Sequence, residues 1–111
     1  MKKDSKIFIG HILESINLIE EYAYHLTKEK FETDHAIQDA IIRRLEIIGE
    51  AVKNIETSFK TKHPDIPWKK IAGMRDMLIH KYFDIDLSLT WTVIKRDLPS
   101  VKEKLQEILD S

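Results

Sequence analysis

Apolar residues recur at steps of three and four over most of this chain. Such spacing places them along one face of an α-helix, whereas a half-buried strand would alternate at every second residue. The pattern covers residues 5–28, residues 35–59 and a last segment that begins after Asp86. In the last segment it is most regular and runs through Leu87, Trp91, Ile94, Leu98, Val101, Leu105 and Ile108. Three long amphipathic helices are therefore predicted.

Residues that commonly cap helices stand before each long segment. Asp4 or Ser5 precedes the first, Asp34 the second, and Asp86 or Ser88 the last. Because short connections between amphipathic helices make antiparallel neighbours, we predict an all-α fold, an up-and-down four-helix bundle with a shorter third helix.

The shorter helix is expected to follow the clearest break in the chain, residues 60–67. Pro67 suits the first helical position, where its missing N–H costs nothing. Gly73 should either weaken this helix or permit a close approach of two backbones. Pro99 should kink the last helix.

Length and composition narrow the class of protein. The 111 residues suit one domain, residues 1–111. With 18 Lys plus Arg against 19 Asp plus Glu, the overall field does not favour a polyanionic partner, so any RNA contact must be local. The absence of cysteine excludes disulfides and thiolate sites. The apolar run of residues 7–13 is too short to span a membrane, and we expect a soluble, cytoplasmic protein with no membrane partner.

The second predicted helix carries a polar face with several charges. Arg43, Arg44, Glu46, Glu50 and Lys53 are spaced for ion pairs such as Arg43–Glu46 and Glu50–Lys53. The simplest interpretation is a solvated surface. Further apolar residues lie outside the main stripe of this helix, which indicates a central position or a dimer contact.

Residues 73–86 contain the most reactive side chains of the chain. On a continuous helix Asp76 and His80 would lie one turn apart, so the carboxylate could hold the imidazole in one tautomer. Arg75 and His80 would instead point about 140° apart. Either the helix ends near His80, or two copies of the motif meet across a dimer.

The residue types in this stretch allow cleavage of RNA by its own 2′-hydroxyl. His80 would act as general base or acid, and Arg75 would hold the phosphate. Asp84 and Asp86 lack a third well-spaced ligand, so neither a metal nor another cofactor is expected. Residue types alone favour a simpler alternative, in which Arg75, Asp76 and His80 form an ordinary ion cluster at a helix end.

Three separated motifs resemble the HepT family of HEPN domains, the toxin half of HepT/MntA toxin–antitoxin pairs. The motifs are Arg75-x4-His80-x-Tyr82, Ile66-Pro67-Trp68 and Arg44-Leu-Glu-Ile-Ile-Gly-Glu50. The resemblance covers nearly the whole chain. It implies a HEPN-like bundle that forms a homodimer, with the two motifs facing a shared cleft. It also implies a metal-independent RNA endonuclease in which Arg75 and His80 are catalytic.

The same resemblance implies roles for neighbouring residues. Asp76 would support His80. An MntA-like nucleotidyltransferase antitoxin would neutralise the toxin by AMPylation of Tyr82, because added charge and bulk beside His80 would block the phosphate site. Lys81 and Arg44 are further candidates for phosphate or RNA contacts.

Two alternatives to a ribonuclease toxin stay open. The chain could be a non-catalytic, nucleotide- or partner-binding subunit of a nucleotidyltransferase complex, with Arg75 and His80 as phosphate ligands. It could also be a structural dimer with a degenerate site.

Overall fold

The first helix, α1 (Ser5–Ala23), begins at a side-chain cap. The computed structural model describes residues 4–80 and 84–110, and only the backbone of His80. The Asp4 carboxylate accepts a hydrogen bond from the amide of Lys6 at 2.9 Å, as its position predicts. The helix ends at Ala23 and not at residue 28, because Thr27 caps a new short helix, α2 (Lys28–Thr33), which turns Phe31 fully into the core.

Helix α3 (His35–Lys53) is the central element of the fold. Its cap is Asp34, which accepts from the amide of Ile37 at 3.0 Å. It packs against α1, α2 and the later short helices, which explains why it buries apolar residues beyond one stripe. It ends at Lys53, earlier than predicted, because Asn54 turns back to donate to the Glu50 carbonyl at 2.8 Å. A separate helix, α4 (Thr57–Lys62), follows.

The predicted third helix is divided into α5 (Trp68–Ala72) and α6 (Met74–Leu78). Gly73 separates them, in keeping with its expected weakening of the helix. Pro67 stands just before α5 as its cap residue and not at the first helical position. The indole N–H of Trp68 donates to the His63 carbonyl at 3.0 Å and ties this segment to the preceding loop.

A two-stranded hairpin follows α6 and was not predicted. Strands β1 (Ile79–His80) and β2 (Asp84–Ile85) are antiparallel, with Ile79 opposite Ile85 and His80 opposite Asp84. Asp86 closes the hairpin, since its amide donates to the Leu78 carbonyl at 2.7 Å. The Asp86 carboxylate accepts from the amide of Leu89 at 2.9 Å and caps the next helix.

The last helical run consists of α7 (Leu87–Thr92), the π-helical turn η2 (Val93–Asp97) and α8 (Leu98–Asp110). Pro99 is the second residue of α8. It cannot donate to the carbonyl of Lys95, and its ring crowds that carbonyl, which lies within the widened π turn. The distortion predicted at Pro99 therefore appears just before it.

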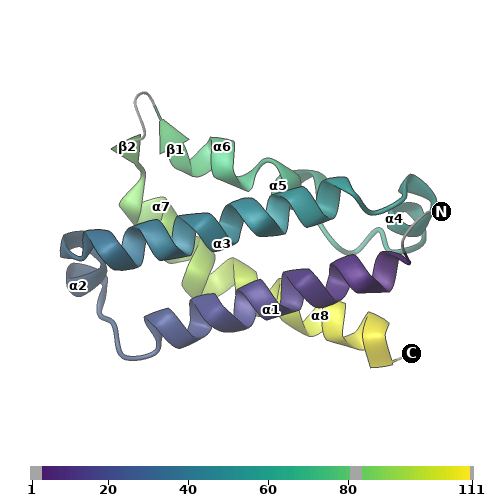
Figure 1. Ribbon diagram of the computed structural model, residues 1–111, viewed down its shortest axis with the longest axis horizontal. Coiled ribbons are helices and arrows are strands. Elements are labelled where there is room, and N and C mark those ends of the chain that lie inside the picture. Colours follow the sequence, from purple (N-terminus) through teal and green to yellow (C-terminus); the bar gives the residue numbers. More distant parts are fainter. Residues whose placement is uncertain (1–3, 81–83, 111) are drawn as a thin grey trace.

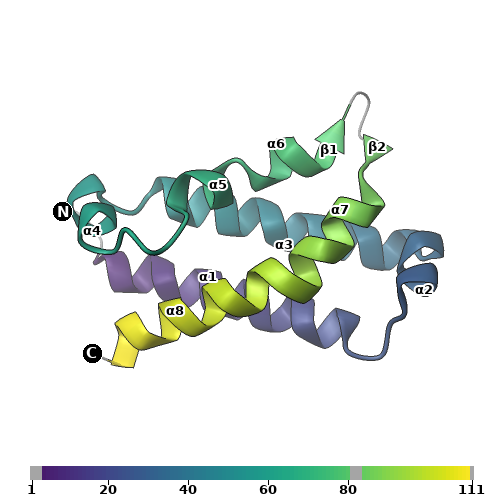
Figure 2. The same ribbon diagram turned by 180° about the vertical axis from the view of Figure 1, so that it is seen from behind.

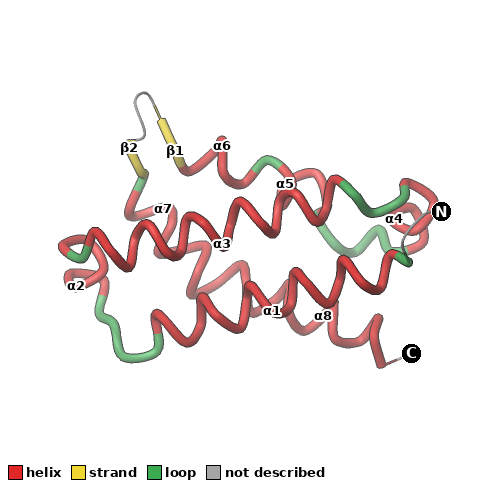
Figure 3. The backbone as a smooth tube through the Cα atoms, in the orientation of Figure 1, coloured by secondary structure: helices red, strands yellow, loops and turns green. Residues whose placement is uncertain are grey.

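The direction of the chain alternates between α1, α3, the α5–α6 segment and the α7–η2–α8 run (Figure 1). Figure 2, the view from behind, shows the last run crossing in front of α1 and α3, and both ends of the described chain lie at one end of the molecule. Figure 3 shows how small the hairpin is beside the helices. The all-α prediction is confirmed, but the third helix of the predicted bundle is replaced by short pieces that pack on α3. Among the described residues, no helix is long and apolar enough to cross a membrane.

Candidate functional site

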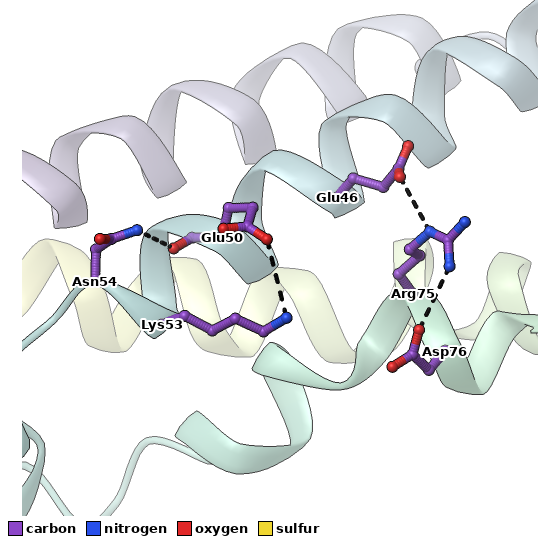
Figure 4. Close-up of polar contacts among 6 residues, drawn as sticks. All are labelled: Glu46, Glu50, Lys53, Asn54, Arg75 and Asp76. Atoms are coloured by element: carbon purple, nitrogen blue, oxygen red, sulfur yellow. Dashed lines mark hydrogen bonds and ion pairs between the residues drawn. The ribbon is translucent and has the colours of Figure 1, made fainter.

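Arg75 lies in the first turn of α6 and is bound by two carboxylates (Figure 4). Its Nε donates to Oε2 of Glu46 on α3 at 3.0 Å, and its Nη1 donates to Oδ1 of Asp76 at 3.4 Å. The Arg75 and Glu46 side chains are 39% and 35% exposed, and that of Asp76 is 82% exposed. Ion pairs so open to solvent add only about 0–1 kcal/mol to stability. The geometry of the cluster is therefore of more interest than its contribution to folding.

The guanidinium of Arg75 keeps a face for a ligand. With Nε bound to Glu46 and Nη1 to Asp76, no contact with either carboxylate is drawn from the third nitrogen, Nη2 (Figure 4). A guanidinium carries five N–H donors, and an edge with two nitrogens matches two oxygens of a phosphate or carboxylate. Arg75 can accordingly bind an oxyanion while Glu46 stays in place.

Arg75, Glu46 and Asp76 line an open groove of about 600 Å³. The groove is formed by α1, α3 and the α5–α6 segment, and its lining includes Phe8, His11, Arg43, Ile47, Gly49, Glu50, Ala51, Lys53, Asn54 and Ala72. Three cationic side chains, Arg43, Lys53 and Arg75, face three carboxylates. Leaving His11 aside, the formal charges that line the groove cancel. Binding of an anionic ligand would therefore depend on the positions of the three cations and not on a net positive charge.

Helix α6 ends two residues before His80. Arg75 and His80 therefore do not share one helix. Of the two arrangements considered from the sequence, a helix that ends near His80 or two motifs that meet across a dimer, the structure shows the first. The same ending means that Asp76 and His80 are not one helical turn apart. The contact that the structure gives Asp76 is with Arg75.

Several predicted site residues are placed only in part. The structure describes the backbone of His80, in β1, and its catalytic role stays a prediction. Lys81 and Tyr82 lie outside the described residues. Of two adjacent arginines on α3, Arg43 lines the groove, whereas Arg44 points about 100° away around the helix.

Glu46 is the residue of this site that sequence reasoning assigned to the wrong partner. Glu46 was expected to pair with Arg43. In the structure its carboxylate instead binds Arg75, 29 residues away in sequence. The expected Glu50–Lys53 pair is present, at 3.9 Å. The sequence did offer one indication that Glu46 belongs to the site, because it lies in the motif that runs from Arg44 to Glu50. That motif does not indicate which residue Glu46 binds.

One of the two aspartates after His80, Asp84 and Asp86, has a structural use. Asp86 caps α7, which accounts for one of them. In the described part of the chain, no three His, Asp or Glu side chains are grouped as a metal ion would require.

Comparison with known proteins adds evidence from sequence. The model of the family described as "Ribonuclease HepT-like" matches residues 12–108. The chain is 47% identical over 108 residues to the "Probable ribonuclease HepT" of Thermococcus cleftensis, covering 97% of this chain and 98% of that one. No solved structure shows a significant match.

A second relative is a longer protein. The chain is 54% identical over 110 residues to the "Gamma-glutamylcyclotransferase and putative RNase MJ0434" of Methanocaldococcus jannaschii. The match covers 99% of this chain but 50% of that protein, so the chain spans about half the length of this relative.

Proposed function

Because the chain belongs to the HepT-like ribonuclease family, we propose that it is an RNA endonuclease that works without a metal ion. Arg75 and His80 are its catalytic residues. The observation that carries this proposal is the position of Arg75, which Glu46 holds in the lining of the groove while Nη2 has no drawn contact with either neighbouring carboxylate (Figure 4).

The reaction needs only a base, an acid and a cation. A base removes the proton of the 2′-hydroxyl, the 2′-oxygen forms a bond to the adjacent phosphorus, and the bond from phosphorus to the 5′-oxygen breaks. An acid gives a proton to the departing 5′-oxygen. His80 serves as base or acid because imidazole titrates near neutral pH, and Arg75 stabilises the charge on the phosphate oxygens.

The groove offers a path for the RNA strand beside the reacting phosphate. Arg43 and Lys53 line it with Arg75, at positions where they can contact neighbouring phosphates. The carboxylates of Glu46, Glu50 and Asp76 reduce non-specific attraction, so binding should depend on strand placement and fall with salt. Arg44 and Lys81 remain further candidates for phosphate or RNA contacts.

The active unit is proposed to be a homodimer with the two Arg75/His80 motifs facing one cleft. The family resemblance supports this arrangement.

The biological role is proposed to be that of a toxin in a toxin–antitoxin pair. Its antitoxin is an MntA-like nucleotidyltransferase, which transfers AMP to Tyr82. This residue follows His80 by two positions in the segment that joins β1 to β2. A nucleotide on its phenol would add negative charge next to the phosphate site and repel RNA.

Growth on induction of the chain tests this proposal. Wild type should arrest growth and degrade cellular RNA, and folded Arg75→Ala and His80→Ala variants should do neither. Arg96→Ala is the matched control, because Arg96 also binds the aspartate next to it, Asp97 at 3.0 Å, on another helix. A harmless wild type that leaves RNA intact would replace the proposal with the non-catalytic binding subunit.

A further inference from the structure

The contact between Glu46 and Arg75 joins two different layers of the fold. Glu46 projects from α3, the central helix, whereas Arg75 lies in the first turn of the short helix α6. The backbones are close here, since a Cβ atom on Gly49, less than one turn after Glu46, would lie 3.2 Å from the carbonyl oxygen of Ala72. The Glu46 carboxylate is thus carried by a helix whose backbone lies close to the segment that bears Arg75.

Which nitrogen of Arg75 binds Glu46 determines which nitrogens remain for a phosphate. Glu46 accepts from Nε and leaves the edge formed by Nη1 and Nη2 to other partners. A carboxylate bound across both Nη atoms would occupy the fork that recognises phosphate. Glu46 instead fixes the rotation of the guanidinium about its own axis without covering that fork.

Asp76 occupies one atom of the same fork more weakly. Its Oδ1 lies 3.4 Å from Nη1, against 3.0 Å for the Glu46 contact, and its side chain is mostly exposed. An exposed carboxylate at that distance can swing into solvent when a phosphate arrives. Of the two acidic partners of Arg75, Glu46 is therefore the fixed one and Asp76 the one that a phosphate can displace.

We infer that Glu46 is a positioning residue of the ribonuclease: it binds Nε of Arg75 and directs the Nη1–Nη2 edge toward the scissile phosphate, while Asp76 gives way to that phosphate. This inference rests on the proposed function of Arg75. It assigns to α3 a part in the reaction, although none of its residues touches the reacting atoms.

The assignment predicts opposite effects on rate and on affinity. Without Glu46 the guanidinium rotates, and a misplaced catalytic group typically lowers the rate by about 10- to 100-fold. The same change removes a negative charge close to the phosphate, so RNA should bind equally well or more tightly. A residue needed only for folding would lower the amount of active protein and leave KM unchanged.

The test uses single-turnover cleavage of one RNA and binding of its uncleavable analogue with a 2′-deoxy nucleotide at the cut site. Glu46→Ala should cleave about 10- to 100-fold more slowly with unchanged or tighter binding. Glu46→Gln should lose less, because its amide oxygen still accepts from Nε. Glu103→Gln is the control, since Glu103 is an exposed carboxylate of α8 that is not part of the groove lining, and should stay near wild type. Unchanged or faster cleavage by Glu46→Ala would overturn the inference.

A second measurement does not need activity. In protein labelled with ¹⁵N-arginine, the Nε–H of Arg75, identified by its loss in Arg75→Lys, should exchange slowly with solvent in the wild type. Exchange should become fast in Glu46→Ala and stay slow in Glu50→Ala. Rapid exchange in the wild type would overturn the positioning role. If exchange is slow but the wild type cuts no RNA, the ribonuclease proposal fails while the contact itself stands.

Discussion

Gly49 of α3 faces the carbonyl oxygen of Ala72, the last residue of α5, so closely that an added Cβ would sit 3.2 Å from that oxygen. The contact sets the distance between the central helix and the segment that carries Arg75. It lies on the side of α3 that lines the groove.

Gly49→Ala should move this segment and weaken the site. The alanine gains about 1 kcal/mol of helix propensity, but overpacking against a backbone carbonyl costs about 1–3 kcal/mol. We expect a net loss of stability in urea denaturation together with slower RNA cleavage. Gly10→Ala is the control, because a Cβ on Gly10 would meet nothing within 4 Å. It should stabilise the protein by about 0.5–1 kcal/mol. Equal stabilisation by both changes would contradict this role for Gly49.

Gln38 should make a measurable contribution to folding. Its buried side-chain amide donates to the Phe31 carbonyl at 2.8 Å and fastens α2 to α3. Gln38→Met keeps the size of the side chain but removes this hydrogen bond, at a cost of about 0.5–1.5 kcal/mol, because the Phe31 carbonyl still accepts from the Asp34 amide at 3.4 Å. Thermal or urea unfolding checks this value. Gln106→Met, at an exposed position of α8, should change stability by less than about 0.5 kcal/mol; a similar loss in both would remove the case for Gln38.

Asp86 should link the stability of α7 to the hairpin. Asp86→Ala removes the cap accepted from Leu89 and should cost about 1 kcal/mol. Asp86→Asn can still accept that bond and should lose a few tenths of this amount. Because the Asp86 amide also closes the hairpin on Leu78, hydrogen exchange at the amides of β1 and β2 should rise in Asp86→Ala. Unchanged exchange would mean that the cap and the hairpin are independent.

Tyr82→Phe should leave the protein toxic but prevent its neutralisation by the partner. The variant lacks the hydroxyl that would accept AMP, so it should arrest growth even when the partner nucleotidyltransferase is co-expressed. Intact-mass measurement of the co-expressed wild type should show added AMP, and the variant should show none. Neutralisation of Tyr82→Phe by the partner would contradict regulation at this residue.

The sequence predicted the features of this fold that depend on neighbouring residues. Asp4, Asp34 and Asp86 cap helices as expected, since a cap needs only the next two or three amides. The helix ends at Ala23 and Lys53 were predicted too late. Those ends depend on the burial of Phe31 and on a local side-chain bond from Asn54, neither of which apolar spacing reports.

The candidate site was predictable to a smaller extent. The resemblance identified the family, which the comparisons support. The interpretation of Glu46 as part of a solvated face missed its bond to Arg75, because a partner 29 residues away leaves no periodic signal. Likewise, the role of Gly49 depends on the packing of α5 against α3, which the sequence alone does not indicate. The catalytic roles of Arg75 and His80, and the modification of Tyr82, stay predictions.

Cleavage of a single RNA in the presence of EDTA is the most direct test of the central claim. Purified wild type should cut it and leave a 2′,3′-cyclic phosphate, and the analogue with one 2′-deoxy nucleotide at the cut site should stay intact. Arg75→Ala and His80→Ala should reduce the rate at least about 100-fold, while Arg96→Ala should not. Cleavage that needs a divalent ion, or that survives in the folded Arg75→Ala and His80→Ala variants, would contradict the account.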